Sequence, residues 1–245
     1  MGQAIGRIEI LPDLLALAHH VAEWMTQAAL AAQGTFRVSL SGGSTPKTLY
    51  GLLASDEFRS RFPWQLVSWY WGGERFVPYD HPESNFRMTR EAMLAKAPVP
   101  PENIHPVPTD GTPEDAARRY ERTLQEAYGA AALDPHRPLF DITLLGLGPD
   151  GHTASLLPGE PVLNERKHWV AAVAHGRPEV RITMTYPAIE SSRRVAFLVA
   201  GEEKAEIFSA IRAGNSQVPA ARVQPVGELF WFVDQTAAGE RGREQ

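Results

Sequence analysis

The run Phe140-Asp-Ile-Thr-Leu-Leu-Gly-Leu-Gly-Pro-Asp-Gly-His152 decides the fold class of this chain. Its first half, from Phe140 to Leu145, is almost continuously apolar, which is typical of a strand buried on both faces of a parallel sheet. Its second half, from Gly146 to His152, consists mainly of glycine, proline and polar residues. We therefore expect a central strand that ends in a tight loop carrying the polar side chains of Asp150 and His152.

Further strands and helices alternate on both sides of this run. Short apolar or alternating segments predict strands at residues 5–10, 36–40, 66–71, 169–173, 181–185, 194–199 and 229–233. Helical spacing of apolar residues and capping signals predict helices over residues 12–32, 47–53, 84–96, 113–128 and 202–212. Such alternation predicts an α/β fold with a mostly parallel sheet and helices on both faces. We expect one domain over residues 1–245.

The composition narrows the possible partners. The net charge of -5 argues against a broad surface for nucleic acid or an anionic membrane, while leaving room for a small basic pocket. The chain has no cysteine, so disulfides, thiolate metal ligands and a cysteine nucleophile are excluded. It shows no signal-peptide pattern and no apolar run near the ~20 residues that span a bilayer. We expect a cytoplasmic protein without nucleic-acid or membrane partners.

Three glycine-bearing loops each follow an expected strand: Ser41–Pro46, Gly72–Arg75 and Gly146–His152. Ligands of such sheets bind at the carboxyl ends of the strands. The three loops are therefore expected to converge on one crevice, and this coincidence carries more weight than any one of them.

The loop Ser41-Gly-Gly-Ser-Thr-Pro46 has two interpretations. Exposed N–H groups where a loop enters a helix favour an anion, above all a phosphate. The alternative is a tight strand-to-helix turn capped by Ser44 or Thr45. The loop is not a P-loop, because the required Gly-Lys-Ser/Thr spacing is missing.

The loop Gly146-Leu-Gly-Pro-Asp-Gly-His-Thr-Ala-Ser155 is the sharper signal. Its glycines superficially match a dinucleotide motif, but Pro149 and the late position in the chain argue against a nicotinamide cofactor. Asp150 and His152 lack a third residue at metal-ligand spacing, so no metal is expected. A buried structural role for His152 is the remaining alternative to catalysis.

These motifs, taken together, closely resemble those of the 6-phosphogluconolactonase family. The resemblance rests on Ser41–Pro46, Trp71-Gly-Gly-Glu-Arg-Phe-Val-Pro78, Asp80 with Ser84-Asn85, Gly146–Pro158, Arg181-Ile-Thr-Met-Thr and Val199-Ala-Gly-Glu-Glu-Lys204. Several motifs in matching order over nearly the whole chain are far more specific than one glycine loop.

The resemblance implies a glucosamine-6-phosphate deaminase-like fold, a modified doubly wound α/β sheet. It also implies hydrolysis of 6-phospho-D-glucono-1,5-lactone to 6-phosphogluconate, the second step of the oxidative pentose phosphate pathway, with no cofactor. In that family's scheme His152 would activate water. The substrate phosphate would be held by Gly42, Gly43, Ser44, Thr45, Arg181 and Lys204.

Other candidate residues keep two interpretations. Asp150 would either orient the imidazole of His152 or contact a sugar hydroxyl. Arg75 would either bind substrate or form a structural ion pair. A backbone N–H near Gly148 or Gly43 could stabilise the developing oxyanion.

One position departs from the family, which usually reads Trp-Gly-Asp-Glu-Arg where this chain has Gly73. Losing that acid argues against a deaminase or isomerase, which must move a proton between two carbons. Glu74 could replace it only if the strand end rotates, because adjacent strand residues point to opposite faces. Ser84 and Asn85 are expected to cap and order a helix.

Two alternatives to lactone hydrolysis stay open: a deaminase-like enzyme and a non-catalytic sugar-phosphate sensor. In each case the expected ligand is a small sugar phosphate, and the protein is a monomer or a small homo-oligomer.

Overall fold

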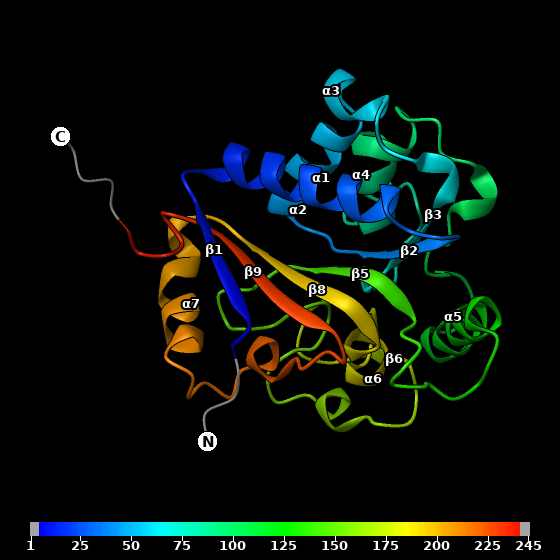
Figure 1. Ribbon diagram of the computed structural model, residues 1–245. Coiled ribbons are helices and arrows are strands. Elements are labelled where there is room, and N and C mark those ends of the chain that lie inside the picture. The colour runs from blue at the N-terminus through cyan, green and yellow to red at the C-terminus, as the bar shows by residue number, and fades with distance from the viewer. Residues whose placement is uncertain (1–4, 241–245) are drawn as a thin grey trace.

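The computed structural model describes residues 5–240. Its main sheet has six parallel strands in the order β1-β9-β8-β5-β2-β3 (Figure 1). In that order the strands are β1 (Arg7–Leu11), β9 (Glu228–Asp234), β8 (Ser192–Val199), β5 (Phe140–Leu145), β2 (Phe36–Leu40) and β3 (Val67–Trp71). Each corresponds to a strand expected from the sequence.

Helices cover both faces of this sheet, with α1 to α4 on one side and α6 and α7 on the other (Figure 1). The helices are α1 (Leu14–Leu30), α2 (Ser44–Leu53), α3 (Asp56–Arg59), α4 (Asn85–Thr89), α5 (Pro113–Tyr128), α6 (Tyr186–Glu190) and α7 (Ala205–Arg212). A π-helical turn, Arg90–Leu94, continues α4.

The alternation of side chains along β9 shows how the two layers are joined. Phe230 and Phe232 point to one face and pack edge-on against Trp24 of α1. Trp231, between them, points to the other face and packs against Phe208 of α7. Because both faces of the strand are apolar, burying them needs a helix on each side. The predicted α/β fold class with a mostly parallel sheet is confirmed.

Helix α2 begins three residues earlier than the sequence predicted. Gly43 takes a φ of 104°, a left-handed conformation that favours glycine, and the helix starts at Ser44. Pro46 lies inside the first turn, where its missing N–H removes no helical hydrogen bond. A proline that was interpreted as part of the loop is therefore part of the helix.

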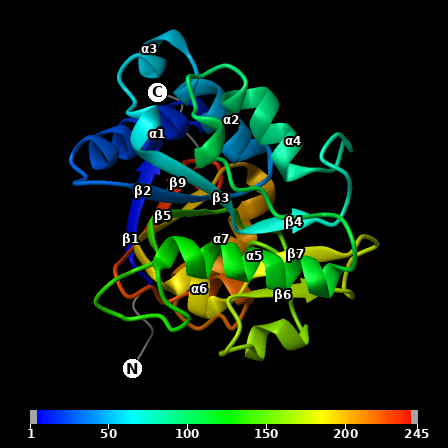
Figure 2. The ribbon, with the colours of Figure 1, turned by 90° about the vertical axis from the view of Figure 1, so that its right-hand side faces the viewer.

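A second, three-stranded antiparallel sheet lies beside the first, in the order β4-β7-β6 (Figure 2). It consists of β4 (Gly73–Arg75), β7 (Arg181–Met184) and β6 (Val170–Val173). The sequence predicted the last two as strands of the main sheet and β4 as a loop. Strand patterns do not specify partners, so the separate sheet was not foreseen.

The topology opens a crevice between β2 and β5. From β2 the chain passes through α2 to β3 at one edge of the main sheet, whereas from β5 it passes through the second sheet to β8 on the other side. The loops after β2 and β5 therefore lead away from each other. Such a switch point is where ligands bind in open α/β sheets.

The apolar side chains of both sheets and their helices form one continuous core cluster. This continuity supports a single domain, although the prediction for residues 1–245 extends beyond the described residues and stays a prediction. None of the described helices is both long and apolar enough to cross a membrane.

Candidate active site

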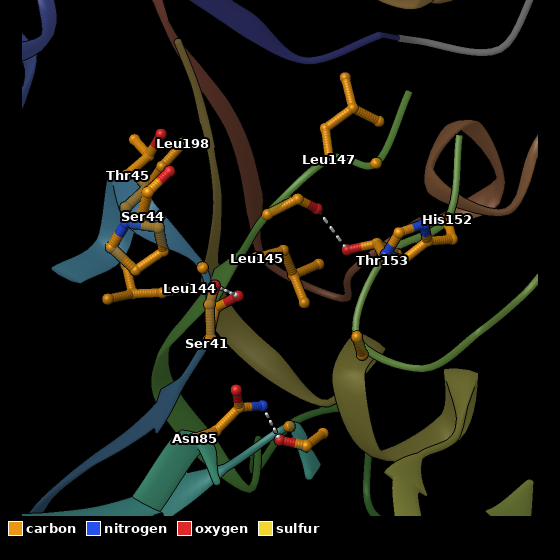
Figure 3. A pocket seen from close by; sticks show the side chains of 18 of the residues that line it. Ser41, Ser44, Thr45, Asn85, Leu144, Leu145, Leu147, His152, Thr153 and Leu198 are labelled. Carbon is orange, nitrogen blue, oxygen red and sulfur yellow. Dashed lines mark hydrogen bonds between the residues drawn. The ribbon is translucent and has the colours of Figure 1, made fainter. Parts of the chain in front are cut away.

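A cavity of about 250 Å³ lies at the carboxyl ends of β2, β3, β5 and β8 (Figure 3). The predicted convergence of the three glycine loops is confirmed, since all of them contribute to its wall. Of the candidate residues, the cavity is lined by Gly42, Gly43, Ser44, Thr45, Arg75, Gly148, His152, Arg181 and Lys204. Asp150 is not part of the lining.

His152 and Asp150 form a tight pair in the turn after β5. Nδ1 of the imidazole lies 2.6 Å from Oδ1 of Asp150, and the backbone N–H of His152 donates to the same oxygen at 3.1 Å. A carboxylate only accepts hydrogen bonds, so Nδ1 carries the proton and Nε2 is left with a free lone pair. The imidazole is thus prepared to accept a proton from a ligand in the cavity.

Arg177 is a third member of this group, and sequence reasoning missed it. Its Nη2 donates to Oδ2 of Asp150 at 2.7 Å. Partial burial would raise the pKa of Asp150, but the hydrogen bonds from Arg177 and His152 outweigh it and hold that pKa well below its ordinary value. Nothing in the sequence links Arg177 to the glycine turn, because the contact to Asp150 spans 27 residues.

The pKa of His152 is lowered from its ordinary value of 6.5. Burial is the main cause, and the nearby cations Arg177 and Arg181 add to it, while Asp150 opposes the shift. A lower pKa increases the neutral, basic fraction of the imidazole at pH 7.

The backbone of the turn is fully engaged around Gly148. The N–H of Gly148 donates to the carbonyl of His152 at 2.9 Å, and the Gly148 carbonyl accepts from Gly151 at the same distance. The hydroxyl of Thr153 ties the turn to the carbonyl of Gly146 at 2.8 Å (Figure 3). The N–H of Gly148 itself is therefore already used within the turn, and the expectation of an oxyanion donor near Gly148 or Gly43 stays a prediction.

The start of helix α2 forms the opposite side of the cavity, where Ser44 and Thr45 lie across from His152 (Figure 3). No side chain caps this helix. The N–H groups of its first turn have no acceptor within the helix, and they carry the positive end of its dipole. This end of the cavity is suited to an anion.

Two arginines face each other across the second sheet at the cavity wall. Arg75 of β4 and Arg181 of β7 are directly paired residues. Glu179 hydrogen-bonds Arg181, with Nε at 3.0 Å, and lies 3.8 Å from Nε of Arg75. Nε of Arg75 is buried without a hydrogen-bond partner in the described part of the chain. The ion pair with Glu179 therefore leaves Nε of Arg75 without a hydrogen bond, so a structural ion pair does not explain the whole side chain.

Lys204 completes the basic side of the cavity at the start of α7. Within residues 5–240, no carboxylate lies within ion-pair distance of its ammonium group. Its charge is available to a ligand.

Glu74 is turned away from the cavity and does not replace the missing acid at Gly73. It is 1% exposed, and its carboxylate accepts backbone N–H groups of Arg75, Asn85 and Phe86 at 2.8 to 2.9 Å. Burial raises its pKa, although these hydrogen bonds oppose the rise. Glu74 is a structural acceptor for the start of α4.

Ser84 caps α4 as expected, accepting the N–H of Arg87 at 3.1 Å. Asn85 does more than the expected helix ordering, because it lines the cavity. Its side chain donates to the carbonyl of Gly73 at 2.9 Å (Figure 3). It also accepts from Arg75 at 3.0 Å.

A metal centre has no obvious place in this arrangement. Across residues 5–240, no three His, Asp or Glu side chains come together in a way that could hold a metal ion.

Comparison with known proteins assigns this chain to a family. The family model described as glucosamine-6-phosphate isomerases/6-phosphogluconolactonase matches residues 12–231. The chain belongs to this family.

Its relatives within the glucosamine-6-phosphate isomerase/6-phosphogluconolactonase family include curated lactonases. A 6-phosphogluconolactonase from Synechocystis is 45% identical over 214 residues, covering 85% of this chain and 86% of that protein. The 6-phosphogluconolactonase from Homo sapiens is 36% identical over 233 residues, covering 91% and 87% of the two chains.

Solved structures of the family superimpose over almost the entire chain. The 6-phosphogluconolactonase from Thermotoga maritima is 30% identical with a TM-score of 0.79, covering 93% of this chain and 99% of that one. A monomeric glucosamine-6-phosphate deaminase has a TM-score of 0.80 at 21% identity, covering 96% and 100%. The latter likeness shows the shared fold alone, and confirms the deaminase-like architecture.

Proposed function

We propose that this protein hydrolyses 6-phospho-D-glucono-1,5-lactone to 6-phosphogluconate, with His152 as the general base. The observation that carries this proposal is one cavity with a neutral, Asp150-oriented imidazole on one side and an anion-binding helix start on the other. Its curated relatives are named for the same reaction.

The basic groups of the cavity match a phosphate in charge and position. Arg75 and Arg181 are directly opposed, an arrangement that like charges disfavour. Glu179 neutralises one of the two, so one positive charge is in excess, and Lys204 adds a second. A phosphate monoester carries about −1.5 to −2 charges at pH 7. We assign these three cations, with the N–H groups at the start of α2, to the substrate phosphate.

The reaction needs no covalent enzyme intermediate, because a lactone carbonyl is already electrophilic. Nε2 of His152 takes a proton from a water molecule as that water attacks C1, and the ring oxygen leaves when the tetrahedral intermediate collapses. The protonated Nε2 gives its proton to the leaving alkoxide, which restores the neutral imidazole, and the new carboxylic acid loses a proton to solvent to give the open-chain carboxylate. General-base assistance of this kind is worth about 10²–10⁴-fold in rate.

Asp150 orients the imidazole in this scheme and does not contact the sugar. It lies behind the ring, outside the cavity lining, with one carboxylate oxygen on Nδ1. Of the two interpretations that the sequence left open, the positioning role is the better supported.

A deaminase reaction is disfavoured at the same site. It needs an acid–base group that moves a proton between two carbons, and position 73 offers no side chain while Glu74 faces the interior. We further propose that the enzyme acts in the cytoplasm as a monomer or small homo-oligomer.

The test is a coupled assay. Glucose-6-phosphate dehydrogenase generates the lactone, and 6-phosphogluconate formation is compared with spontaneous opening in the absence of this protein. Hydrolysis well above that background supports the proposal. Binding of 6-phosphogluconate without acceleration would favour a sensor, and ammonia release from glucosamine 6-phosphate would favour a deaminase.

A further inference from the structure

Arg177 lies behind the catalytic imidazole, in the segment between β6 and β7. Its Nη2 is 2.7 Å from Oδ2 of Asp150 and 3.5 Å from Nδ1 of His152. Neither Arg177 nor Asp150 lines the cavity. The guanidinium therefore approaches the back of the ring and not the ligand.

We propose that Arg177 is a positioning residue for His152: it fixes the Asp150 carboxylate behind the imidazole and offsets its negative charge. The role in catalysis rests on the proposed lactone hydrolysis, whereas the effect on the imidazole exists in the free protein as well.

That Arg177 positions the imidazole of His152 follows from the hydrogen bonds that hold the carboxylate of Asp150. Oδ1 of Asp150 accepts both Nδ1–H and the backbone N–H of His152, and Oδ2 accepts from Arg177. With both oxygens engaged, the carboxylate cannot rotate, and the ring that depends on it keeps one orientation. Without Arg177, Oδ2 would face solvent, because the side chain of Asp150 is 36% exposed.

That Arg177 offsets the charge of Asp150 follows from the charged groups that surround the imidazole of His152. Asp150 of the same turn favours the protonated imidazole, whereas Arg177 and Arg181 of β7 disfavour it. A carboxylate alone beside His152 would raise the pKa of the imidazole and reduce the neutral form that acts as a base. The Arg177 guanidinium keeps the orienting effect of Asp150 while opposing the rise in the pKa of His152 that the carboxylate causes.

The alternative is an ordinary surface ion pair. The side chain of Arg177 is 33% exposed, and such pairs often contribute little to stability. A merely structural pair would not change the titration of His152, so that titration separates the two roles.

The experiment compares R177Q and R177K with the unmodified protein. Histidine titrations by NMR, with the His152 signal assigned from H152A, measure the pKa in the free protein, and kcat/KM is measured from pH 5 to 9. We expect R177Q to raise the pKa of His152, because a positive charge beside the imidazole is lost. The acid limb of kcat/KM should move upward by the same amount, and R177K should stay close to the unmodified protein.

The matched control is R61Q, which breaks an exposed arginine–carboxylate pair with Glu23 outside the cavity lining. R61Q should change neither the NMR titration of His152 nor the pH dependence of kcat/KM. An unchanged His152 titration in R177Q would overturn the proposal.

R177M, which keeps the aliphatic stem, replaces R177Q if that variant does not fold. Absence of lactonase activity in the unmodified protein would defeat the proposed function instead, and the titration would still decide the role of Arg177.

Discussion

Gly148 and His152 are in such close contact that no side chain fits between them. A Cβ placed on Gly148 would lie 2.0 Å from Nδ1 of His152 and 2.8 Å from Oδ1 of Asp150. The far end of the imidazole is flexible in principle, but here it is held by its carboxylate partner. The absence of a side chain at position 148 is therefore a requirement for the geometry of the Asp150–His152 pair.

We expect G148A to displace the imidazole and lower kcat about as strongly as loss of the base itself, by roughly 10²–10⁴-fold. KM should change little, because the phosphate end of the cavity is untouched. The control is G51A in helix α2, where an added Cβ meets no atom within 4 Å. Normal turnover in G148A, measured with the coupled assay, would mean that the ring does not need its present position.

Lys204 should contribute mainly to substrate binding. Removing its ammonium group loses a charge-assisted contact to phosphate, worth about 1.5–3 kcal/mol. That corresponds to a KM about 10- to 100-fold higher for K204A, with kcat reduced much less. K96A removes an exposed lysine outside the cavity and is the matched control. A K204A variant that loses kcat and keeps KM would place Lys204 at the reacting carbon instead.

Glu74 should prove important for stability. In E74Q, the amide nitrogen would face backbone N–H donors that the carboxylate now accepts, leaving buried groups unsatisfied at a cost of about 1–3 kcal/mol. Thermal unfolding should show a lower Tm by roughly 2–4 °C per kcal/mol. E126Q, on the exposed side of α5, should change Tm very little. If E74Q melts at the same temperature as the unmodified protein, the carboxylate is not the anchor of α4 described above.

The sequence specified the main sheet well because its strands have patterns of their own. The apolar run Phe140–Leu145 and the alternating run Phe36–Leu40 predicted buried strands, and the structure contains both. The second sheet could not be predicted, because one of the two partners of Arg181–Met184 is the short segment Gly73–Arg75, which has no strand pattern, and nothing in the sequence pairs the other, Val170–Val173, with it. Pairing between distant segments is decided by tertiary packing.

The residues of the candidate site likewise fall into those that the sequence identified and those that it did not. Residues that carry a local motif, such as His152 in its glycine turn and Ser44 at a helix start, were identified from the sequence. Arg177 was not identified, because its role arises only from a contact to Asp150 across 27 residues. The hydrogen bond from the Gly148 N–H to the carbonyl of His152 was not foreseen either, because a backbone hydrogen bond within a turn has no sequence signature.

The most direct test of the account is the turnover number of H152A for the lactone, with spontaneous opening subtracted. A second Asp–His pair on the surface provides the control: His136 lies 3.2 Å from Asp134 at the same two-residue spacing, with its side chain 96% exposed. We expect H152A to lose about 10²–10⁴-fold in kcat with KM nearly unchanged, and H136A to behave like the unmodified protein. An H152A enzyme that turns over at the unmodified rate would contradict the assignment of this imidazole as the base.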